Sequence, residues 1–552
     1  MCGIAGCIGR RDEKTVNRML DAMTHRGPDD RGIHTVNGTV LGHTRLSIVD
    51  VTGGHQPIVA DSGATGIICN GEIYNFRGLR RKLLANYRFK TQSDTEAILH
   101  LYREKGPECV KDLDGMFAFA ILDGEQFMLA RDPIGIKPLY YGHLGERLYF
   151  ASELGAMTLA GLDSVHEFPA GHYYTPEQGF VQYYKIPEIE DHLLTDTDDA
   201  CEIIRETFVQ AVKKRLLSDR DIHVGSFCSG GLDSSLVAAI AAKEIPNLHT
   251  FVVGMRDENG EESDDLKASR IAAEHIGSTH HELIFTEEEY YEALPVVIQK
   301  LESYDPSLVR CAVPCYFTCK LAADYVTVVL TGEGADEIFT GYHYMKHFPM
   351  ETLNQEARRC IGNLHNINLQ RADRMGMLFS LELRVPFLDV DMINLAMKIP
   401  PEFKIRDSEK VGARIEKWIL RKAFEDQGYL PEEILWRYKV QYTQGAGCES
   451  LGERLAEKEM SEDEYERIKA EHPQAVINSR EAAYYFKIFR QFHPQDSILG
   501  SVGIWTGFDF EEEREQVRGT VDGDRIHLQG EKDGSGGRMP SNVEGQPSRV
   551  VT

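Results

Sequence analysis

The sequence has no apolar run of the roughly 18–20 residues that a membrane-spanning helix requires. Its N-terminus also lacks a basic segment followed by an apolar core, the pattern of a secretory signal peptide. Basic residues are in the minority, because 61 Lys and Arg stand against 87 Asp and Glu, for a net charge of −26. This deficit argues against a nucleic-acid-binding surface, which needs a basic stripe. We therefore predict a cytoplasmic protein that binds neither membranes nor nucleic acid.

The acidic balance also sets a condition on any anionic substrate. Because the overall field repels anions, such a ligand must be held by a local basic or backbone-amide pocket. The apolar fraction of 42% and the charged fraction of 27% are ordinary for a globular protein. A chain of 552 residues is long enough for two to four domains, each with its own core.

The cysteines show no disulfide framework. There are eleven, an odd number without regular spacing, which favours a reducing compartment. Cys311, Cys315 and Cys319 are four residues apart, so they share one face of a predicted helix. We interpret them as core-packing thiols, with metal binding as the alternative.

The first part of the chain, residues 1–190, reads as short β segments separated by turn signals. Helical patterns interrupt them at residues 13–25 and 93–105. Strands and a few helices in this order fit a layered α+β domain.

In residues 191–515 the pattern changes to alternating strands and helices. Apolar segments at 222–227, 250–254 and 325–330 are typical of strands buried on both faces. This alternation predicts an α/β domain with a doubly wound parallel sheet, in which ligands bind at the carboxyl ends of the strands. Residues 516–552 are polar and rich in glycine, which predicts a disordered tail.

A glycine-rich loop follows the first of these strands, Ser229-Gly230-Gly231-Leu232-Asp233-Ser234. Its glycines let the backbone approach an anion, and the amides of the following helix N-terminus point toward it. It is not a Walker P-loop, because no Gly-Lys-Ser/Thr follows. It resembles the pyrophosphate loop of ATP-pyrophosphatases, which adenylate a carboxylate or carbonyl and release pyrophosphate. In that interpretation Asp233 holds Mg²⁺; the alternative is a glycine turn with a serine cap.

A second loop, Thr331-Gly332-Glu333-Gly334-Ala335-Asp336-Glu337, presents three carboxylates after a buried strand. Such a cluster would repel ATP unless a cation intervened, which again indicates Mg²⁺. A solvated acidic turn is the alternative interpretation.

Cysteine stands at position 2, directly after the start methionine. If Met1 is removed, Cys2 carries both a thiol and a free α-amine, whose ordinary pKa is about 7.7–8. That amine can act as the base for the thiol. A cysteine at this position is commonly incidental, but the phosphate loop gives it weight. Together the two features suggest a chain that releases ammonia at one site and uses it at another.

Hydrolysis of glutamine needs a thiolate, an oxyanion hole and contacts for the amino-acid end of the substrate. Asn70 and the amide of Gly71 can supply the hole, at a few kcal/mol per donor. Arg45 suits a bidentate grip on the α-carboxylate. Asp94 and Glu72 can receive the α-ammonium. Each residue alone fits a turn or surface role, but their joint order behind Cys2 argues for a site.

With these motifs the chain resembles the glutamine-dependent asparagine synthetases of the B type over nearly residues 1–510. Further segments that carry the resemblance are Arg26-Gly27-Pro28-Asp29, residues 131–140, residues 382–389 and Arg437-Tyr438-Lys439. The resemblance implies a four-layer α/β/β/α glutaminase sandwich over residues 1–190 and an ATP-pyrophosphatase domain over 191–515. It also implies a pairing of subunits, a homodimer, although no motif in the sequence indicates one.

The resemblance further implies a reaction. The β-carboxylate of aspartate attacks the α-phosphorus of MgATP, and ammonia from the Cys2 site crosses an internal tunnel to displace AMP. Glu333 then deprotonates or positions ammonia, Lys439 stabilises charge during adenylation, and Asp233 and Asp336 hold the metal. The implied ATP-binding residues are Cys228, Ser229, Gly230, Gly231, Asp233, Ser234, Val253, Thr331 and Gly332. Cys228 and Thr331 depart from the leucine and serine of many relatives, which backbone contacts would tolerate.

Two alternatives stay open. A related amidotransferase acting on another carboxylate acceptor would keep Cys2, whereas β-lactam-forming relatives lose it. A catalytically silent homologue that senses glutamine or nucleotide would be expected to lose Cys2, Asp233, Glu333 or Asp336, and all four are present.

Overall fold

The computed structural model describes residues 2–61, 63–188 and 194–505. The predicted tail, residues 516–552, lies outside the described residues. Within the described ranges no helix combines the length and the apolar character needed to cross a membrane.

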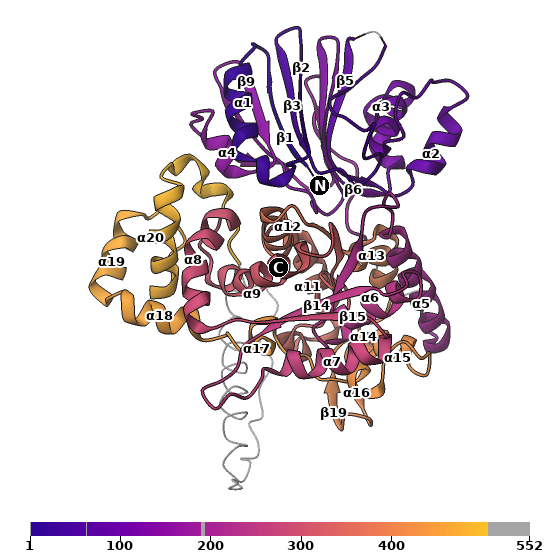
Figure 1. Ribbon diagram of the computed structural model, residues 1–552, viewed down its shortest axis with the longest axis vertical. Coiled ribbons are helices and arrows are strands. Elements are labelled where there is room, and N and C mark those ends of the chain that lie inside the picture. Colours follow the sequence, from indigo (N-terminus) through magenta and orange to yellow (C-terminus); the bar gives the residue numbers. More distant parts are fainter. Residues whose placement is uncertain (1, 62, 189–193, 506–552) are drawn as a thin grey trace, which may run out of the picture. The chain divides into compact units, whose positions relative to one another are not determined.

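Two six-stranded antiparallel sheets form the first part of the chain (Figure 1). The first sheet contains, in order, β10 (His166–Glu167), β8 (Tyr140–Leu144), β9 (Arg147–Ala151), β1 (Gly3–Ile8), β3 (Thr39–Arg45) and β2 (Asp30–Val36). The second contains β12 (Gly179–Gln182), β11 (His172–Thr175), β7 (Gln126–Arg131), β6 (Gly115–Asp123), β5 (Thr65–Ile73) and β4 (Ile58–Val59). Helices α1 (Glu13–Ala22) and α4 (Leu154–Thr158) cover the first sheet, and α2 (Phe76–Leu83) and α3 (Asp94–Lys105) cover the second.

Strand β6 shows why these layers stack. Phe119 and Ile121 lie in one apolar cluster with Ile98 of α3. The residue between them, Ala120, lies in another cluster with Phe150 of the facing sheet. Side chains that alternate along a strand point to opposite faces of its sheet, so one strand binds a helix layer and a sheet layer at once. The predicted α+β class is confirmed.

A five-stranded parallel sheet organises the second part. Its order is β15 (Thr279–Ile284), β14 (His249–Gly254), β13 (Val224–Phe227), β16 (Val328–Leu330) and β17 (Glu382–Arg384). A separate hairpin pairs β18 (Arg406–Ser408) with β19 (Ala413–Ile415). Because β14 and β15 lie on one side of β13, and β16 and β17 on the other, the sheet is doubly wound as predicted.

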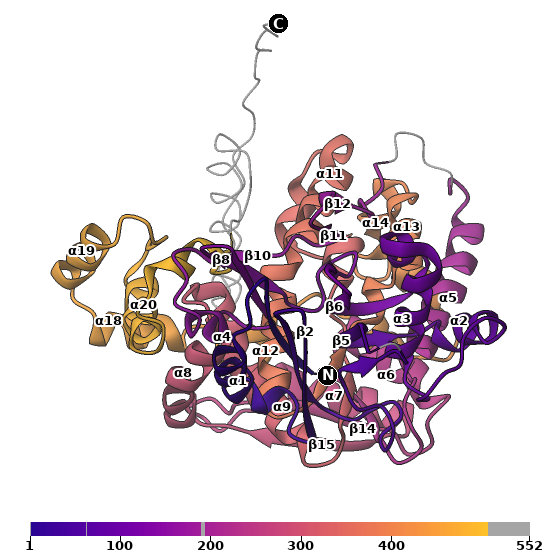
Figure 2. The same cartoon turned by 90° about the horizontal axis from the view of Figure 1, so that it is seen from above.

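The helices of this part cover both faces of the sheet. Residues Val328 and Leu330 of β16 pack with Leu236 of α6, whereas Val329 packs with Val309 of α9. The helices are α5 (Thr197–Lys214), α6 (Leu232–Ala242), α7 (Asp264–Ile276), α8 (Glu287–Leu301), α9 (Pro306–Ala323), α10 (Ala335–Ile338), α11 (Met350–Asn363), α12 (Asn368–Leu378), α13 (Val390–Met397), α14 (Pro401–Lys404), α15 (Trp418–Phe424), α16 (Glu432–Leu435), α17 (Tyr442–Gly445), α18 (Leu451–Glu459), α19 (Glu462–Glu471) and α20 (Arg480–Phe492). Helices α18 to α20 gather beside α8 in both views (Figure 2).

Some predicted boundaries were wrong. The strand expected at 325–330 begins only at Val328, because the amides of Tyr325 and Val326 bond to the carbonyl of Ala322 at the end of α9. The helix expected at 13–25 ends at Ala22 and is followed by a short 3₁₀ turn. The helix predicted for the cysteine triplet is α9, in whose packed core Cys315 and Cys319 are buried.

Candidate active sites

Cys2 lies just before β1, the strand between β9 and β3 in the first sheet. Its backbone nitrogen bonds to Asn70 Oδ1 at 3.0 Å, and its Sγ lies 3.9 Å from the carbonyl oxygen of Leu46. Burial raises the pKa of the Cys2 thiol, and the positive charge of Arg45 partly offsets that effect. The thiol therefore needs a base beside it to become a thiolate.

Asn70, Gly71 and Glu72 lie on β5 in the facing sheet. Asn70 is fully buried, and its Nδ2 has no hydrogen-bond partner among the described residues. A buried amide donor without a partner is unfavourable unless a ligand accepts its hydrogen bond. A side chain at Gly71 would collide with the backbone of β6, since a Cβ there would lie 2.1 Å from the carbonyl oxygen of Met116. The structure thus brings a free donor beside Cys2, as an oxyanion hole requires.

Arg45 is buried at the end of β3, and its guanidinium already has partners. It donates to the carbonyl oxygens of Val49, Asp50 and Val51 at 3.2, 2.6 and 3.1 Å. These bonds hold the 49–51 loop beside the Cys2 region. A substrate carboxylate at Arg45 would have to share or exchange them.

Glu72 and Asp94 form a pair of buried carboxyls. Burial is the main cause that raises the pKa of each, and the charge of Asp94 raises the pKa of Glu72 further. Asp94 accepts a hydrogen bond from the amide of Ile73 at 2.8 Å, and Arg384 Nη2 lies 3.9 Å from Glu72 Oε1. A cationic group between the two carboxyls would relieve this cost, and the α-ammonium of an amino acid is such a group.

The first phosphate loop lies between β13 and α6, as predicted. Gly230 has a φ of +74°, and a Cβ there would lie 2.3 Å from the backbone carbon of Ala268, so glycine alone fits. The Ser234 hydroxyl accepts from the amide of Ser229 at 3.1 Å and also contacts Ser229 Oγ at 3.1 Å. These two contacts between Ser229 and Ser234 stabilise the conformation of the loop.

The second loop follows β16, the neighbour of β13, so the two loops meet at one edge of the sheet. Here Asp233 and Asp336 share a lysine that the sequence analysis missed. Lys417 Nζ lies 2.5 Å from Asp233 Oδ2 and 2.5 Å from Asp336 Oδ1. Lys439 Nζ lies 2.9 Å from Asp336 Oδ2 and 4.0 Å from Asp233 Oδ2. The two predicted metal ligands and the predicted lysine therefore converge.

The electrostatics of this cluster are opposite to those around Glu72 and Asp94. Burial alone would raise the pKa of Asp336, but Lys417 and Lys439 hold it far below its usual value. Gly341 makes the contact with Lys417 possible, because a Cβ there would lie 2.0 Å from Lys417 Cε. No sequence motif marks Lys417, which lies between β19 and α15 and 184 residues from Asp233 in the chain.

A magnesium ion fits the donor set. Asp233 Oδ1 is buried and has no hydrogen-bond partner among the described residues. Two carboxylates at a phosphate-binding edge are the oxygen ligands that Mg²⁺ takes together with phosphates. The ion would have to displace or share the contacts of Lys417.

The remaining predicted residues lie around the same edge. Glu333 pairs with Arg371 of α12, which the sequence analysis did not single out. Thr331 donates its amide to the carbonyl of Arg384 at 2.9 Å, and Gly332 lies against Asp233 and Ser234. Cys228 and Val253 are buried at the ends of β13 and β14.

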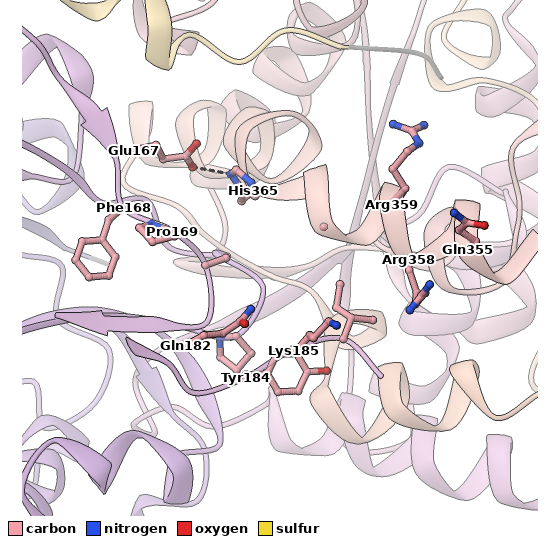
Figure 3. Close-up of a pocket in the computed structure, with 14 residues that line it drawn as sticks. Glu167, Phe168, Pro169, Gln182, Tyr184, Lys185, Gln355, Arg358, Arg359 and His365 are labelled. Carbon is pink, nitrogen blue, oxygen red and sulfur yellow. Dashed lines mark hydrogen bonds and ion pairs between the residues drawn. The ribbon is translucent and has the colours of Figure 1, made fainter. Parts of the chain in front are cut away.

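A separate cavity of 660 Å³ contains none of these residues (Figure 3). It is lined mainly by the segment between β10 and β11, by the end of β12 and the residues after it, and by α11 and the turn that follows it. Its charged groups are already paired: His365 Nδ1 lies 2.7 Å from Glu167 Oε1, and Arg358 Nη2 lies 2.8 Å from Glu188 Oε1. We assign it no ligand.

Two family models match the two parts of the chain. A model of the glutamine amidotransferase domain matches residues 1–184, and a model of asparagine synthase matches residues 203–359 and 350–487. A Bacillus subtilis structure, the glutamine phosphoribosylpyrophosphate amidotransferase, matches with a TM-score of 0.30 and 20% identity over 47% of this chain and 67% of that one.

Two relatives match nearly the whole chain. A Schizosaccharomyces pombe protein, named a probable glutamine-hydrolysing asparagine synthetase, is 40% identical over 508 residues, covering 86% of this chain and 89% of that protein. The Arabidopsis thaliana glutamine-hydrolysing asparagine synthetase 3 is 38% identical over 526 residues, covering 91% of this chain and 89% of its own. This chain therefore belongs to the family of glutamine-hydrolysing asparagine synthetases.

Proposed function

We propose that this chain makes asparagine from aspartate, using ammonia that it releases from glutamine at Cys2 and ATP bound at residues 229–234. One observation carries the proposal: a single chain contains a buried thiol beside an amide donor and, separately, a phosphate loop beside a carboxylate–lysine cluster. Family membership supports the choice of glutamine, aspartate and ATP as substrates.

At the first site, removal of Met1 frees the α-amine of Cys2 to take the thiol proton. The sulfur then attacks the amide carbon of glutamine, while Asn70 Nδ2 and the Gly71 amide stabilise the oxyanion. Collapse of that intermediate releases ammonia and leaves a thioester, which water hydrolyses to glutamate. Arg45 receives the α-carboxylate, and Glu72 and Asp94 receive the α-ammonium.

At the second site, the β-carboxylate of aspartate attacks the α-phosphorus of ATP, so that pyrophosphate leaves and a mixed anhydride with AMP forms. Ammonia then attacks the carbonyl carbon of the anhydride, and AMP leaves with the bonding electrons. Asp233 and Asp336 would hold Mg²⁺, which would supply positive charge for the phosphates. Lys439 stabilises the charge that develops during adenylation, and Glu333 positions or deprotonates the ammonia.

The nucleotide itself is held by backbone and side chains at the carboxyl ends of the strands. We assign this role to Cys228, Ser229, Gly230, Gly231, Asp233, Ser234, Val253, Thr331 and Gly332. An internal tunnel would keep the released ammonia from being protonated in bulk water on its way to the second site.

The proposal also covers the domain boundaries, the oligomeric state and the localisation. We infer a glutaminase domain over residues 1–190 and a synthetase domain over 191–515. From the family resemblance we further infer a homodimer, from the cysteine pattern a cytoplasmic protein, and from the charge balance a protein without affinity for nucleic acid.

The test is an assay of purified protein with MgATP, aspartate and either glutamine or ammonium. Equimolar asparagine, AMP and pyrophosphate with both nitrogen donors are expected. Glutamate release without asparagine or pyrophosphate would show that aspartate is the wrong acceptor and would point to an amidotransferase acting on another carboxylate.

A further inference from the structure

Helix α12 carries side chains that reach toward both candidate sites. Arg371 pairs with Glu333 in the second loop. Asp373, two residues later, faces the first part of the chain and binds Arg26 there. Arg384 of β17, shortly after the helix, lies near Glu72. One short stretch of the synthetase half thus contacts residues of both sites.

The contact through Asp373 leads directly to the nucleophile. Arg26 is fully buried, and its Nε donates to the carbonyl oxygen of Cys2 at 3.0 Å. Its Nη1 and Nη2 donate to the two carboxylate oxygens of Asp373 at 2.7 and 3.1 Å. This fork-like pairing sets the plane of the guanidinium as well as its position. The same guanidinium donates to Glu153 at 3.0 Å.

Geometry makes Asp373 necessary to this arrangement. Burial alone would raise the pKa of Asp373, but Arg26 is the main group that lowers it, so the carboxyl is an anion. Without that anion Arg26 keeps Glu153 as a carboxylate partner, but it loses the two-bond pairing that sets its plane and is drawn toward Glu153 instead. Any such movement of Arg26 displaces the Cys2 carbonyl, and a shift of about 1 Å in a reacting group can cost about 10²-fold in rate.

We propose that Asp373 is a positioning residue for glutamine hydrolysis: it fixes Arg26, which in turn holds the Cys2 backbone. The synthetase half then contributes to the glutaminase site without touching glutamine. This inference rests on the proposed function of Cys2, but not on the identity of the acceptor carboxylate.

The experiment uses the full-length protein and the variant Asp373→Asn. Glutamine hydrolysis is measured without ATP or aspartate, and MgATP binding is measured by calorimetry. We expect the kcat for glutamine hydrolysis to fall by about 10- to 100-fold with KM within about threefold. The Kd for MgATP should stay within about twofold. Asp373→Glu, which keeps the charge, should recover part of the lost kcat; it is also the variant to assay if Asp373→Asn does not fold.

Glu302→Gln is the matched control. Glu302 lies at the C-terminal end of α8 and is buried. It accepts hydrogen bonds from Arg374 of α12 at 2.8 Å and from the amide of Leu154, in the first part of the chain, at 3.0 Å. It makes a comparable buried link between the two parts, but none of its hydrogen bonds reaches Cys2. We expect this variant to be destabilised like Asp373→Asn while its glutaminase kcat stays within about threefold of the unmodified protein.

A double variant tests whether Asp373 acts through Arg26. In an Arg26→Lys background, which keeps the charge but loses the fork, Asp373→Asn should cost clearly less than it does alone. An unchanged glutaminase kcat in Asp373→Asn, an equal loss in Glu302→Gln, or full additivity in the double variant would each overturn the proposal. Because glutamine hydrolysis is measured alone, a failure of aspartate as acceptor would leave these outcomes readable.

Discussion

The two candidate sites hold their carboxylates in opposite electrostatic states. In the glutamine pocket, burial raises the pKa values of Glu72 and Asp94, and no lysine is paired with either in the described structure. At the nucleotide edge, Lys417 and Lys439 lower the pKa of Asp336 far below its usual value. The first site has the Arg384 guanidinium 3.9 Å from Glu72, and the ammonium of an amino acid would add a second cation. The second site carries its own cations, because its substrate brings phosphates.

This contrast explains how a chain with a net charge of −26 can bind ATP. The long-range field is unfavourable, but two lysines offset the charges of Asp233 and Asp336, and the backbone amides of the phosphate loop are suited to bind phosphate. Both lysines come from residues 417–439, a part of the chain remote from the loops that they neutralise.

The largest effect is expected for Cys2→Ala, which should inactivate the first site and leave the second site active. Cys2→Ala removes the nucleophile, so glutamine-driven asparagine synthesis should fall by at least about 10³-fold. Ammonia-driven synthesis should continue, since that site keeps all its groups. Asparagine formation is measured with each nitrogen donor; loss of both activities would contradict the division into two sites.

Asp233→Ala should have the opposite result, with the second site impaired and the first site still active. This change removes a proposed metal ligand and a partner of Lys417, so release of pyrophosphate should fall on the order of 10³-fold. Glutamine hydrolysis without ATP should continue. Pyrophosphate is measured by a coupled assay, and its formation at an undiminished rate would rule out the role of Asp233.

A smaller effect tests whether Lys417 offsets the negative charge of the nucleotide edge. Lys417→Met removes the nearer of the two lysines that Asp233 and Asp336 share, so the affinity for ATP should fall by about 10- to 100-fold. The matched control is Lys422→Met, because Lys422 is partly exposed and pairs with Glu425 instead. Calorimetric titration with MgATP measures both variants. An effect no larger than that of the control would show that Lys417 does not serve the nucleotide.

The smallest effect is a difference in pH dependence. Raised pKa values mean that Glu72 and Asp94 become neutral at a higher pH than ordinary carboxyls do, and a neutral carboxyl attracts an ammonium less. The KM for glutamine should therefore rise as the pH falls toward the acidic range, while the Kd for MgATP should change less, because Asp336 stays ionised. Glu72→Gln should flatten the glutamine profile. If the KM for glutamine and the Kd for MgATP changed equally with pH, the electrostatic difference between the two sites would be contradicted.

The sequence predicted the fold class and placed each glycine-rich loop directly after a buried strand, because both follow from local patterns. Strand–helix alternation predicts a parallel sheet, and loops after neighbouring parallel strands must meet at one edge. The boundary of β16 could not be predicted, since Tyr325 and Val326 are held by the end of α9 rather than by the sheet. Lys417 and Asp373 could not be found either. Each acquires its role from a partner far away in the chain, and neither lies in a motif.

The central claim is that nitrogen released at Cys2 is used at the nucleotide edge of the same molecule. The most direct measurement supplies glutamine labelled with ¹⁵N in its amide group, together with an equal concentration of unlabelled ammonium, MgATP and aspartate. Early in the reaction the asparagine formed should carry mainly ¹⁵N, because the released ammonia does not mix with the bulk. Asparagine with almost no label would mean that the two sites work independently, and would contradict the account.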